Sequence, residues 1–188
     1  DGTDGNVRSF SAGSVAVKTK AFSREKGANG AWSSAYLGSY GGGLGVTDSS
    51  EGNGSGDAHT VDNTGRDNYV LFAFDQSVIV DSTFLGYVVN DSDIQVWIGT
   101  ISGAYGSLPT LSDSVLSSLG FTQVDLTSSS SARWADINNA NYAGNVLIIA
   151  ADTTDTSPED RFKIEKVKVT PAVPGIYANI GTVNVPGA

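Results

Sequence analysis

Apolar and polar residues alternate with a period of two along much of this chain. In residues 15–22 (VAVKTKAF) the apolar side chains fall on one face, and two lysines, Lys18 and Lys20, fall on the other. Residues 94–99 (IQVWIG) alternate in the same way, and so do residues 161–170 (RFKIEKVKVT), with a break in phase that indicates a bulge. A period of two is typical of antiparallel strands with one buried face. Lysines on the outer face would also protect an edge strand from further pairing.

Other segments are apolar almost without interruption. Residues 69–75 (YVLFAFD) and 144–150 (GNVLIIA) predict strands that are covered on both faces, by a second sheet or a helix. Further strands are expected over residues 78–90 and 121–126. The strands recur every 10 to 15 residues or so with turn signals between them, which predicts an all-β, antiparallel β-sandwich or jelly roll.

One short helix is predicted near residues 111–119. Thr110 is the expected N-cap, Asp113 follows three residues later, and Gly120 occupies the expected C′ position. The glycine-rich segment 41–46 predicts positive φ angles or a close backbone approach. It is not a phosphate-binding loop, because no Gly-Lys-Ser/Thr sequence and no helix follow it.

The chain has 188 residues, which suits one domain with a sizeable core. We expect this β domain to span residues 1–170. Residues 171–188 contain prolines and glycines and read as a C-terminal tail. Within the tail, residues 176–185 (IYANIGTVNV) alternate and predict a strand if a neighbouring sheet edge is offered to them.

The net charge is −9, and sixteen aspartates stand against only four glutamates. An acidic chain without a basic stripe excludes nucleic acid as the expected partner. There is no cysteine, so disulfides and thiolate chemistry are excluded. No apolar run reaches the roughly 18 residues of a membrane span. The start at Asp1 predicts a processed product whose signal peptide has been removed, although a trimmed chain would look the same.

The aspartates have two interpretations. Asp is common in turns because its side chain bonds to nearby backbone, and a turn-rich chain needs many such residues. Asp and Asn oxygens are also the ligands that Ca²⁺ prefers. The polar half of residues 57–75 and the turn around Ser92 supply the candidates for a calcium site. These candidates are Asp62, Asn63, Asp67, Asp91 and Asp93.

A catalytic function is not expected. The single histidine, His59, lies near no nucleophile motif such as G-x-S-x-G, which argues against a Ser-His-Asp triad. Asp91 and Asp93 would form a glycosidase pair only if they faced each other across a cleft at about 5 to 9 Å, whereas residues two apart on a strand point the same way. The sequence therefore predicts that the protein is not an enzyme.

Aromatic residues suggest a second kind of site. Trp32 and Trp97 are expected to be buried. Tyr105 and Trp134 are flanked by turn residues and are the expected exposed pair, which would stack on sugar rings.

Several short blocks occur in a fixed order between about residues 7 and 170. They are GAW at 30–32, AYLGSY at 35–40, GLGV at 43–46, HTVDN at 59–63, DNYVLF at 67–72, LGY at 85–87, DSDI at 91–94 and DRFKI at 160–164. Together they resemble blocks of the bacterial PEP-CTERM secreted proteins. The resemblance implies export, sorting by an exosortase, and residence at the surface or in the biofilm matrix of a Gram-negative bacterium. The Pro-Glu-Pro sorting tail of that family is not among these residues, and the family implies no reaction.

Two functions follow as expectations. The first is a non-enzymatic extracellular surface or matrix protein that self-assembles, with residues 176–185 or the N-terminal strand 7–22 adding to the sheet of a neighbour. The alternative is a calcium-dependent carbohydrate-binding module for exopolysaccharide.

Overall fold

The protein is described by a computed structural model that covers residues 2–52, 58–154 and 157–172. It is almost entirely β, with 58% strand and 4% helix, and all strand pairs are antiparallel. The all-β prediction is therefore confirmed. The elements are β1 (Val7–Ala12), β2 (Val15–Glu25), β3 (Trp32–Tyr40), β4 (Gly43–Thr47), β5 (Val61–Asp62), β6 (Arg66–Asn90), β7 (Ile94–Gly99), α1 (Asp113–Ser118), β8 (Phe121–Asp125), β9 (Arg133–Asp136), β10 (Ala143–Ala151) and β11 (Asp160–Pro171).

Five strands close into a barrel. β2 pairs with β3, β3 with β4, β4 with β11, β11 with β6, and β6 returns to β2. On the other edge of β6, its first half pairs with β10, which continues through β7 to β8. The finer prediction of a β-sandwich or jelly roll is not confirmed, because the hydrogen bonding runs all the way round this ring.

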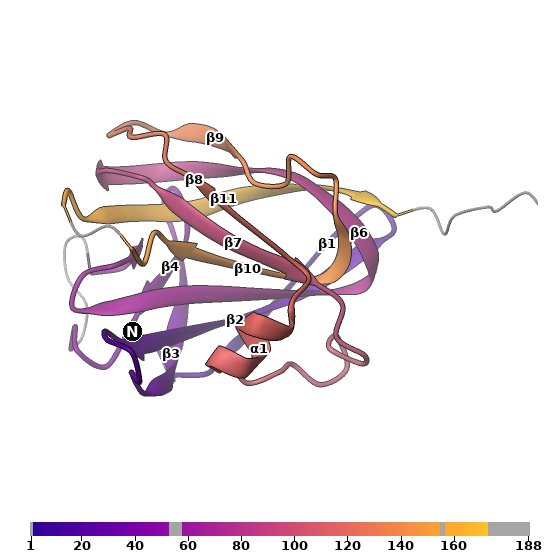
Figure 1. Ribbon diagram of the computed structural model, residues 1–188, viewed down its shortest axis with the longest axis horizontal. Coiled ribbons are helices and arrows are strands. Elements are labelled where there is room, and N and C mark those ends of the chain that lie inside the picture. The colour runs from indigo at the N-terminus through magenta and orange to yellow at the C-terminus, as the bar shows by residue number, and fades with distance from the viewer. Residues whose placement is uncertain (1, 53–57, 155–156, 173–188) are drawn as a thin grey trace, which may run out of the picture.

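β6 joins the two walls of the molecule. Its first half pairs with β2 and β10, and its second half pairs with β11 and β9. Figure 1 shows this strand curving round one end of the barrel. The separate strands predicted over residues 69–75 and 78–90 are thus one strand. The polar residues between them do not end it. Asp75 accepts a hydrogen bond from the amide of Ala16 at the start of β2, and Gln76 donates one to the carbonyl of Ser14 in the turn between β1 and β2.

The core has two layers, as the apolar runs predicted. In β6, Val70 and Phe72 point into the barrel while Leu71 points to the outer face, and β10 alternates in the same way. The outer face is covered by the connection that contains α1 (Figure 1). Its buried leucines, Leu111 and Leu119, pack there with half-buried Val115 and Leu116. The prediction that both faces of these strands are covered is therefore confirmed.

The predicted helix is present, but its cap differs. α1 begins at Asp113, and its N-cap is Ser112, whose hydroxyl accepts a hydrogen bond from the Val115 amide at 3.2 Å. Thr110 lies too early in the chain to cap it. The Asp113 carboxylate instead accepts bonds from Arg24 and Trp32, which ties the helix to the barrel.

The glycine-rich turn fits its prediction. Gly42 and Gly43 have φ angles of 90° and 125°, a region that favours glycine, and they reverse the chain between β3 and β4. The bulges predicted in β11 are also present, at register shifts near Ile164 and Lys168.

The interpretation of the β2 lysines was wrong. β2 pairs with β1, β3 and β6, so it is an interior strand and not an edge. Lys18 lies over the ring of Tyr105 at 4.5 Å, and Lys20 lies over the ring of Phe22 at 5.1 Å. The edge strand on this side is β1, which sequence reasoning did not separate from β2.

The ring of five strands is closed at one level, but one side of the barrel is not hydrogen-bonded along the rest of its length. β4 meets β11 only through the pair of Leu44 and Ile164. Among the described residues, β11 beyond Ile164 pairs with β6 alone, and β1 pairs with β2 alone. We call the gap between β1 and this part of β11 the seam. It is an apolar groove of about 300 Å³. Its lining includes Phe10, Val15, Phe72, Phe74, Val167 and Val169.

Most of the expected tail, including the whole of the predicted strand over 176–185, lies outside the described residues. The division into a domain over 1–170 and a tail stays a prediction. Within the described ranges, no helix has the length and apolar character needed to cross a lipid bilayer.

Candidate functional site

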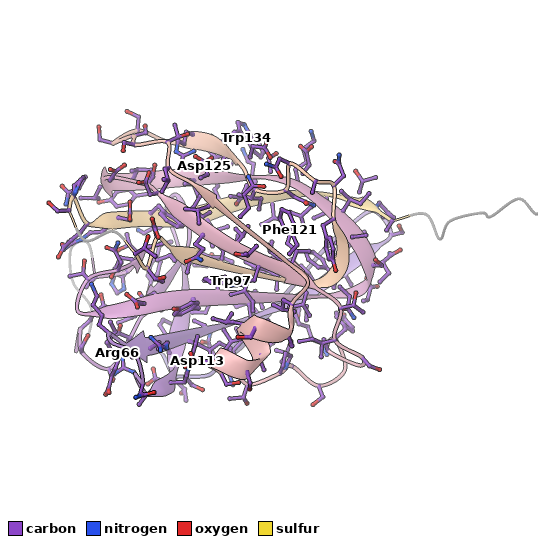
Figure 2. All side chains as sticks on the ribbon, viewed as in Figure 1. Arg66, Trp97, Asp113, Phe121, Asp125 and Trp134 are labelled. Carbon is purple, nitrogen blue, oxygen red and sulfur yellow. The ribbon has the colours of Figure 1, made fainter. Side chains whose placement is uncertain are left out.

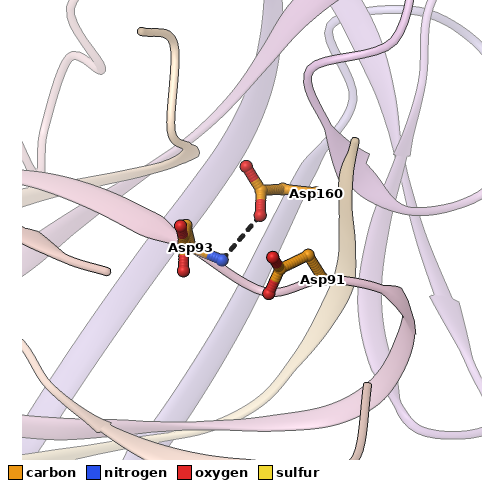
Figure 3. A group of neighbouring side chains, drawn as sticks. All are labelled: Asp91, Asp93 and Asp160. Carbon is orange, nitrogen blue, oxygen red and sulfur yellow. Dashed lines mark hydrogen bonds between the residues drawn. The ribbon is translucent and has the colours of Figure 1, made fainter. Parts of the chain in front are cut away.

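Three buried aspartates meet where strands end. Asp91 and Asp93 lie between β6 and β7, and Asp160 begins β11. One carboxylate oxygen of each lies within 4.8 Å of the others (Figure 3). They are 3%, 4% and 1% exposed. We call this group the acidic cluster.

Local backbone geometry brings the cluster together. Asn90 has a φ of 66°, a left-handed conformation that Asn tolerates better than most residues, and it turns the chain at the end of β6. Asp91 then forms a bridge with Asp160, because β6 and β11 are antiparallel neighbours whose ends coincide here.

Hydrogen bonds fix the carboxylates. Asp160 Oδ1 accepts a bond from the Asp93 amide at 2.7 Å, drawn as the dashed line in Figure 3. Asp91 Oδ1 accepts bonds from the amides of Ser92 and Ser129, at 2.8 and 2.9 Å. These bonds hold the carboxylates of Asp91 and Asp160 in one arrangement beside Asp93.

Asn63 supports the cluster without presenting an oxygen to it. Its Nδ2 donates to Asp160 Oδ2 at 3.0 Å and to the Asp152 carbonyl at 2.8 Å. Its Oδ1 accepts a bond from the Asp160 amide at 3.0 Å. Asn63 thus positions Asp160, a structural role that differs from the ligand role expected of it.

The charges in the cluster repel one another. Burial raises the pKa of Asp160 to about 7, and the neighbouring charges of Asp93, Asp91 and Asp152 act in the same direction, against the hydrogen bond from the Asp93 amide. A divalent cation would relieve this repulsion. Carboxylates that are buried and converge on one point are chemically suited to a hard cation such as Ca²⁺.

A second acidic group lies beside the cluster. Asp62 bonds to the hydroxyl of Thr60 and the amide of Thr64, and Glu51 accepts a bond from the Asp48 amide. Burial raises the pKa of Glu51 to about 8 and that of Asp62 to about 6. The negative charge of Asp48 acts in the same direction on both acids, and that of Asp62 does so on Glu51, while the positive charge of Arg161 opposes the rise in both pKa values. Asp62 therefore belongs to this second group and not to the acidic cluster.

The second group predicts an unusual pH dependence of stability. Folding favours the protonated forms of Glu51 and Asp62. Their contribution to the free energy of unfolding is therefore fully present below the ordinary carboxyl pKa of about 4. It is lost as the pH rises through about 6 for Asp62 and about 8 for Glu51. In chelator, the melting temperature should fall by several degrees between pH 5 and pH 9. The variant Glu51→Gln keeps an oxygen for the Asp48 amide and should flatten this slope. Equal slopes for the two proteins would contradict the assignment.

Two other candidates lie elsewhere. Asp67 pairs in register with Arg24 on β2. Burial raises the pKa of Asp67, and the positive charges of Lys26 and Arg24 only partly oppose this rise. Asp67 is not a member of the acidic cluster. His59 stacks on Tyr40 with ring centroids 4.4 Å apart, and its Nδ1 lies 2.9 Å from the Thr47 hydroxyl. Burial lowers the pKa of His59. The ring stacking and the contact with Thr47 pack His59 into its loop.

The expected aromatic pair is separated. Trp134 is on β9 and is 51% exposed, whereas Tyr105 is half-buried near β2, with the Lys18 amine over its ring. Trp32 and Trp97 are half-buried and both lie against Tyr69.

Sequence reasoning missed Asp160 as a cluster member. It is far from Asp91 in the chain, and its only signal was its position at the start of an alternating strand. Recognising it required the knowledge that this strand pairs with the end of β6.

Comparison with known proteins identifies no relative. No protein-family model, no curated protein and no solved structure matches this chain. The resemblance to PEP-CTERM proteins and the absence of enzymatic activity therefore stay predictions.

Proposed function

We propose that this protein is a non-enzymatic structural component of a bacterial surface or extracellular matrix, and that its copies associate by strand addition. The observation that carries the proposal is the seam. There β1 and β11 each leave one edge without a strand partner among the described residues, beside an apolar groove. Secretion and exosortase sorting are supported by the resemblance of the sequence blocks to PEP-CTERM proteins.

The seam has the features of a site for an added strand. Open edges present backbone amides and carbonyls, and the groove would take side chains from one face of an incoming strand. Phe10 is 47% exposed and Val7 is 49% exposed on β1, so apolar surface is left uncovered at this edge. β1 also lacks the lysines and prolines that commonly protect edges.

The strand that we propose for the seam is the segment 176–185 of a second copy. Its first five residues alternate, so that in an extended chain Ile176, Ala178 and Ile180 share one face and Tyr177 and Asn179 share the other. A stretch with one apolar face matches a groove that is apolar on one side. Because each copy would both give and receive a strand, the contact is head-to-tail and would build filaments.

The proposal predicts that removing the segment abolishes assembly. The full chain should sediment as species larger than one 19.4 kDa chain and form filaments in electron micrographs, whereas a chain ending at residue 175 should sediment as a monomer. The variant Ile180→Lys should behave like the truncation, because it places a charge in the groove. Asn179→Lys, on the opposite face, is the matched control and should assemble normally.

The receiving side is tested by Val169→Lys in the full chain, which should also abolish assembly, because Val169 lines the groove. A full chain that sediments as a monomer would contradict the proposal. So would a truncated chain that forms the same filaments.

We also propose that the acidic cluster binds Ca²⁺. Three buried carboxylates with oxygens within 4.8 Å of one another support this second proposal, and backbone amides hold two of them, those of Asp91 and Asp160. The ion would be held by Asp91, Asp93 and Asp160, and it would stabilise the fold by offsetting their repulsion.

The packing also supports a β-sandwich interpretation of the fold. The wall β1-β2-β6-β10-β7-β8 lies against the wall β9-β6-β11-β4-β3, and the inner apolar cluster fills the space between them. We infer a sandwich whose two sheets are joined at one side through β6 and at the other through the contact between β2 and β3.

A further inference from the structure

Trp134 lies on an outer face of the sheet, away from the seam and from α1. It shares the exposed face of β9 with Asp136, and between them Ala135 points inward and is buried. Figure 2 shows Trp134 at the periphery, on the opposite side of the molecule from Asp113. A tryptophan that is 51% exposed in a strand needs an explanation other than core packing.

The indole of Trp134 packs against the ring of Phe84. Phe84 on β6 is the register partner of Trp134, and the two ring centroids lie 5.2 Å apart. The Lys166 amine lies 5.1 Å from the Phe84 centroid. One side of the indole is therefore packed, and the other remains available to a ligand without a change of rotamer.

Polar groups surround the indole in a shallow groove of about 430 Å³. Asp136 lies opposite Ser82 in the register of β9 and β6, and Asp81 is beside Ser82. The remaining lining residues come from the turn after β9. They are Asn138, Asn139 and Asn141.

The turn after β9 is held rigidly by Asn138. Its Nδ2 donates to the carbonyls of Val80 and Tyr142, and its Oδ1 accepts a bond from the Tyr142 amide, all between 2.8 and 2.9 Å. Asn141 has a φ of 51°, which projects it from the tightest part of the turn. In the described part of the chain, neither the Asn139 nor the Asn141 side chain has a hydrogen-bonding partner, so both amides are available to a ligand.

This combination is chemically suited to a sugar chain. A pyranose ring has an apolar face that stacks on an indole, and its hydroxyls around the edge both donate and accept hydrogen bonds. Carboxylates accept such bonds, hydroxyl groups do both, and primary amides supply donors and acceptors. An interface with a protein would instead expose apolar side chains around Trp134, and this groove has polar ones.

The charges favour a neutral chain. Asp81 is paired with Lys168 at 2.9 Å, which leaves Asp136 as a negative charge in the groove, on a protein with a net charge of −9. A polyanion such as a uronic-acid polymer would be repelled. We propose that the groove around Trp134 is a binding site for a neutral polysaccharide.

The site does not depend on the proposed function. It lies on β9 and β6, away from the lining of the seam, and needs neither assembly nor the segment 176–185. A protein that both polymerises and binds polysaccharide would connect protein filaments to a carbohydrate matrix.

The test is affinity electrophoresis of the full chain through gels that contain hydroxyethyl cellulose, galactomannan, dextran or, as the anionic polymer, alginate. We expect at least one neutral polymer to retard the protein and alginate not to retard it. Trp134→Ala should weaken the retardation at least about tenfold, the loss of one central aromatic contact. Tyr87→Ala removes an exposed aromatic that lines neither the seam nor the groove around Trp134, and it should be retarded like the wild type.

Folding of Trp134→Ala is checked by its melting temperature, and tryptophan fluorescence supplies a second readout. Of the three tryptophans, Trp134 is the most accessible, so the retarding polymer should protect the wild-type protein from iodide quenching and give no protection to Trp134→Ala. Migration unaffected by all neutral polymers would overturn the proposal. So would equal retardation of the wild type and of folded Trp134→Ala.

Discussion

Calcium should raise the melting temperature of the wild-type protein by about 5–10 °C at pH 8, and the variant Asp91→Asn should lose this response. A ligand at about 100 times its Kd adds about 2.7 kcal/mol to the free energy of unfolding, and each kcal/mol corresponds to about 2–4 °C for a chain of this size. The reason is electrostatic. Asp91, Asp93 and Asp160 are buried within 4.8 Å of one another, and each would gain from a shared cation.

Asp91→Asn is chosen because it removes the charge of Asp91 and keeps the hydrogen bonds that hold its side chain. Its remaining oxygen still accepts the Ser92 and Ser129 amides. In chelator at pH 8 the variant should be more stable than the wild type, because one of three repelling charges is gone. Adding calcium should then reverse the order of the two proteins. Differential scanning calorimetry with EDTA or with CaCl₂ measures both effects.

Asp75→Asn is the matched control, since Asp75 is exposed and its one hydrogen bond within the described ranges comes from the Ala16 amide. It should respond to calcium as the wild type does. If calcium leaves the wild-type melting temperature unchanged at pH 8, or shifts Asp91→Asn equally, the acidic cluster does not bind the ion.

The second large effect is expected for Arg133→Met, which should lower the free energy of unfolding by about 3–5 kcal/mol. Arg133 donates to Asp125 at 3.1 Å and, through its other nitrogens, to the hydroxyl and the carbonyl of Ser92. The side chains of Arg133 and Asp125 are only 12% and 13% exposed. Methionine would fill the space but leave the Asp125 carboxylate and the Ser92 carbonyl without their partner.

Urea denaturation at pH 7 measures this loss. Arg24→Met is the control, because Arg24 also pairs with an aspartate, Asp113, which is 58% exposed. Its loss should cost about 0–1 kcal/mol, as is usual for an exposed pair. Similar losses of unfolding free energy in the two variants would show that the buried Arg133–Asp125 pair stabilises the protein no more than an exposed pair does.

Much of the fold was predictable because its signals are local. The alternation in residues 94–99 and 161–170 corresponds to β7 and β11, and the apolar run 144–150 corresponds to β10. The continuity of β6 was not predictable, because Asp75 and Gln76 stay in the strand through bonds to the distant turn at Ser14 and Ala16. β9 was also missed, since four residues next to a serine-rich loop carry little periodicity.

The candidate sites were predictable as residue types and not as groups. Asp91 and Asp93 could be recognised because they share one turn, but their grouping with Asp160 depends on the antiparallel pairing of β6 and β11. Asp62, Asn63 and Asp67 are close in sequence, yet successive residues of an extended chain point to opposite faces, and these three side chains lie in three different surroundings. Trp134 was correctly expected to be exposed. Its expected companion Tyr105 is held elsewhere by Lys18.

The order of pairing in the barrel also has a kinetic consequence. β11, which ends at Pro171, supplies the partner for the second half of β6 and completes the ring. Such long-range contacts form slowly, and they cannot form before the last strand is available. The barrel of a nascent chain would therefore stay open until β11 had been made. Under the proposed export, this delay would keep the polypeptide extended during passage through a translocation channel and postpone folding to the far side.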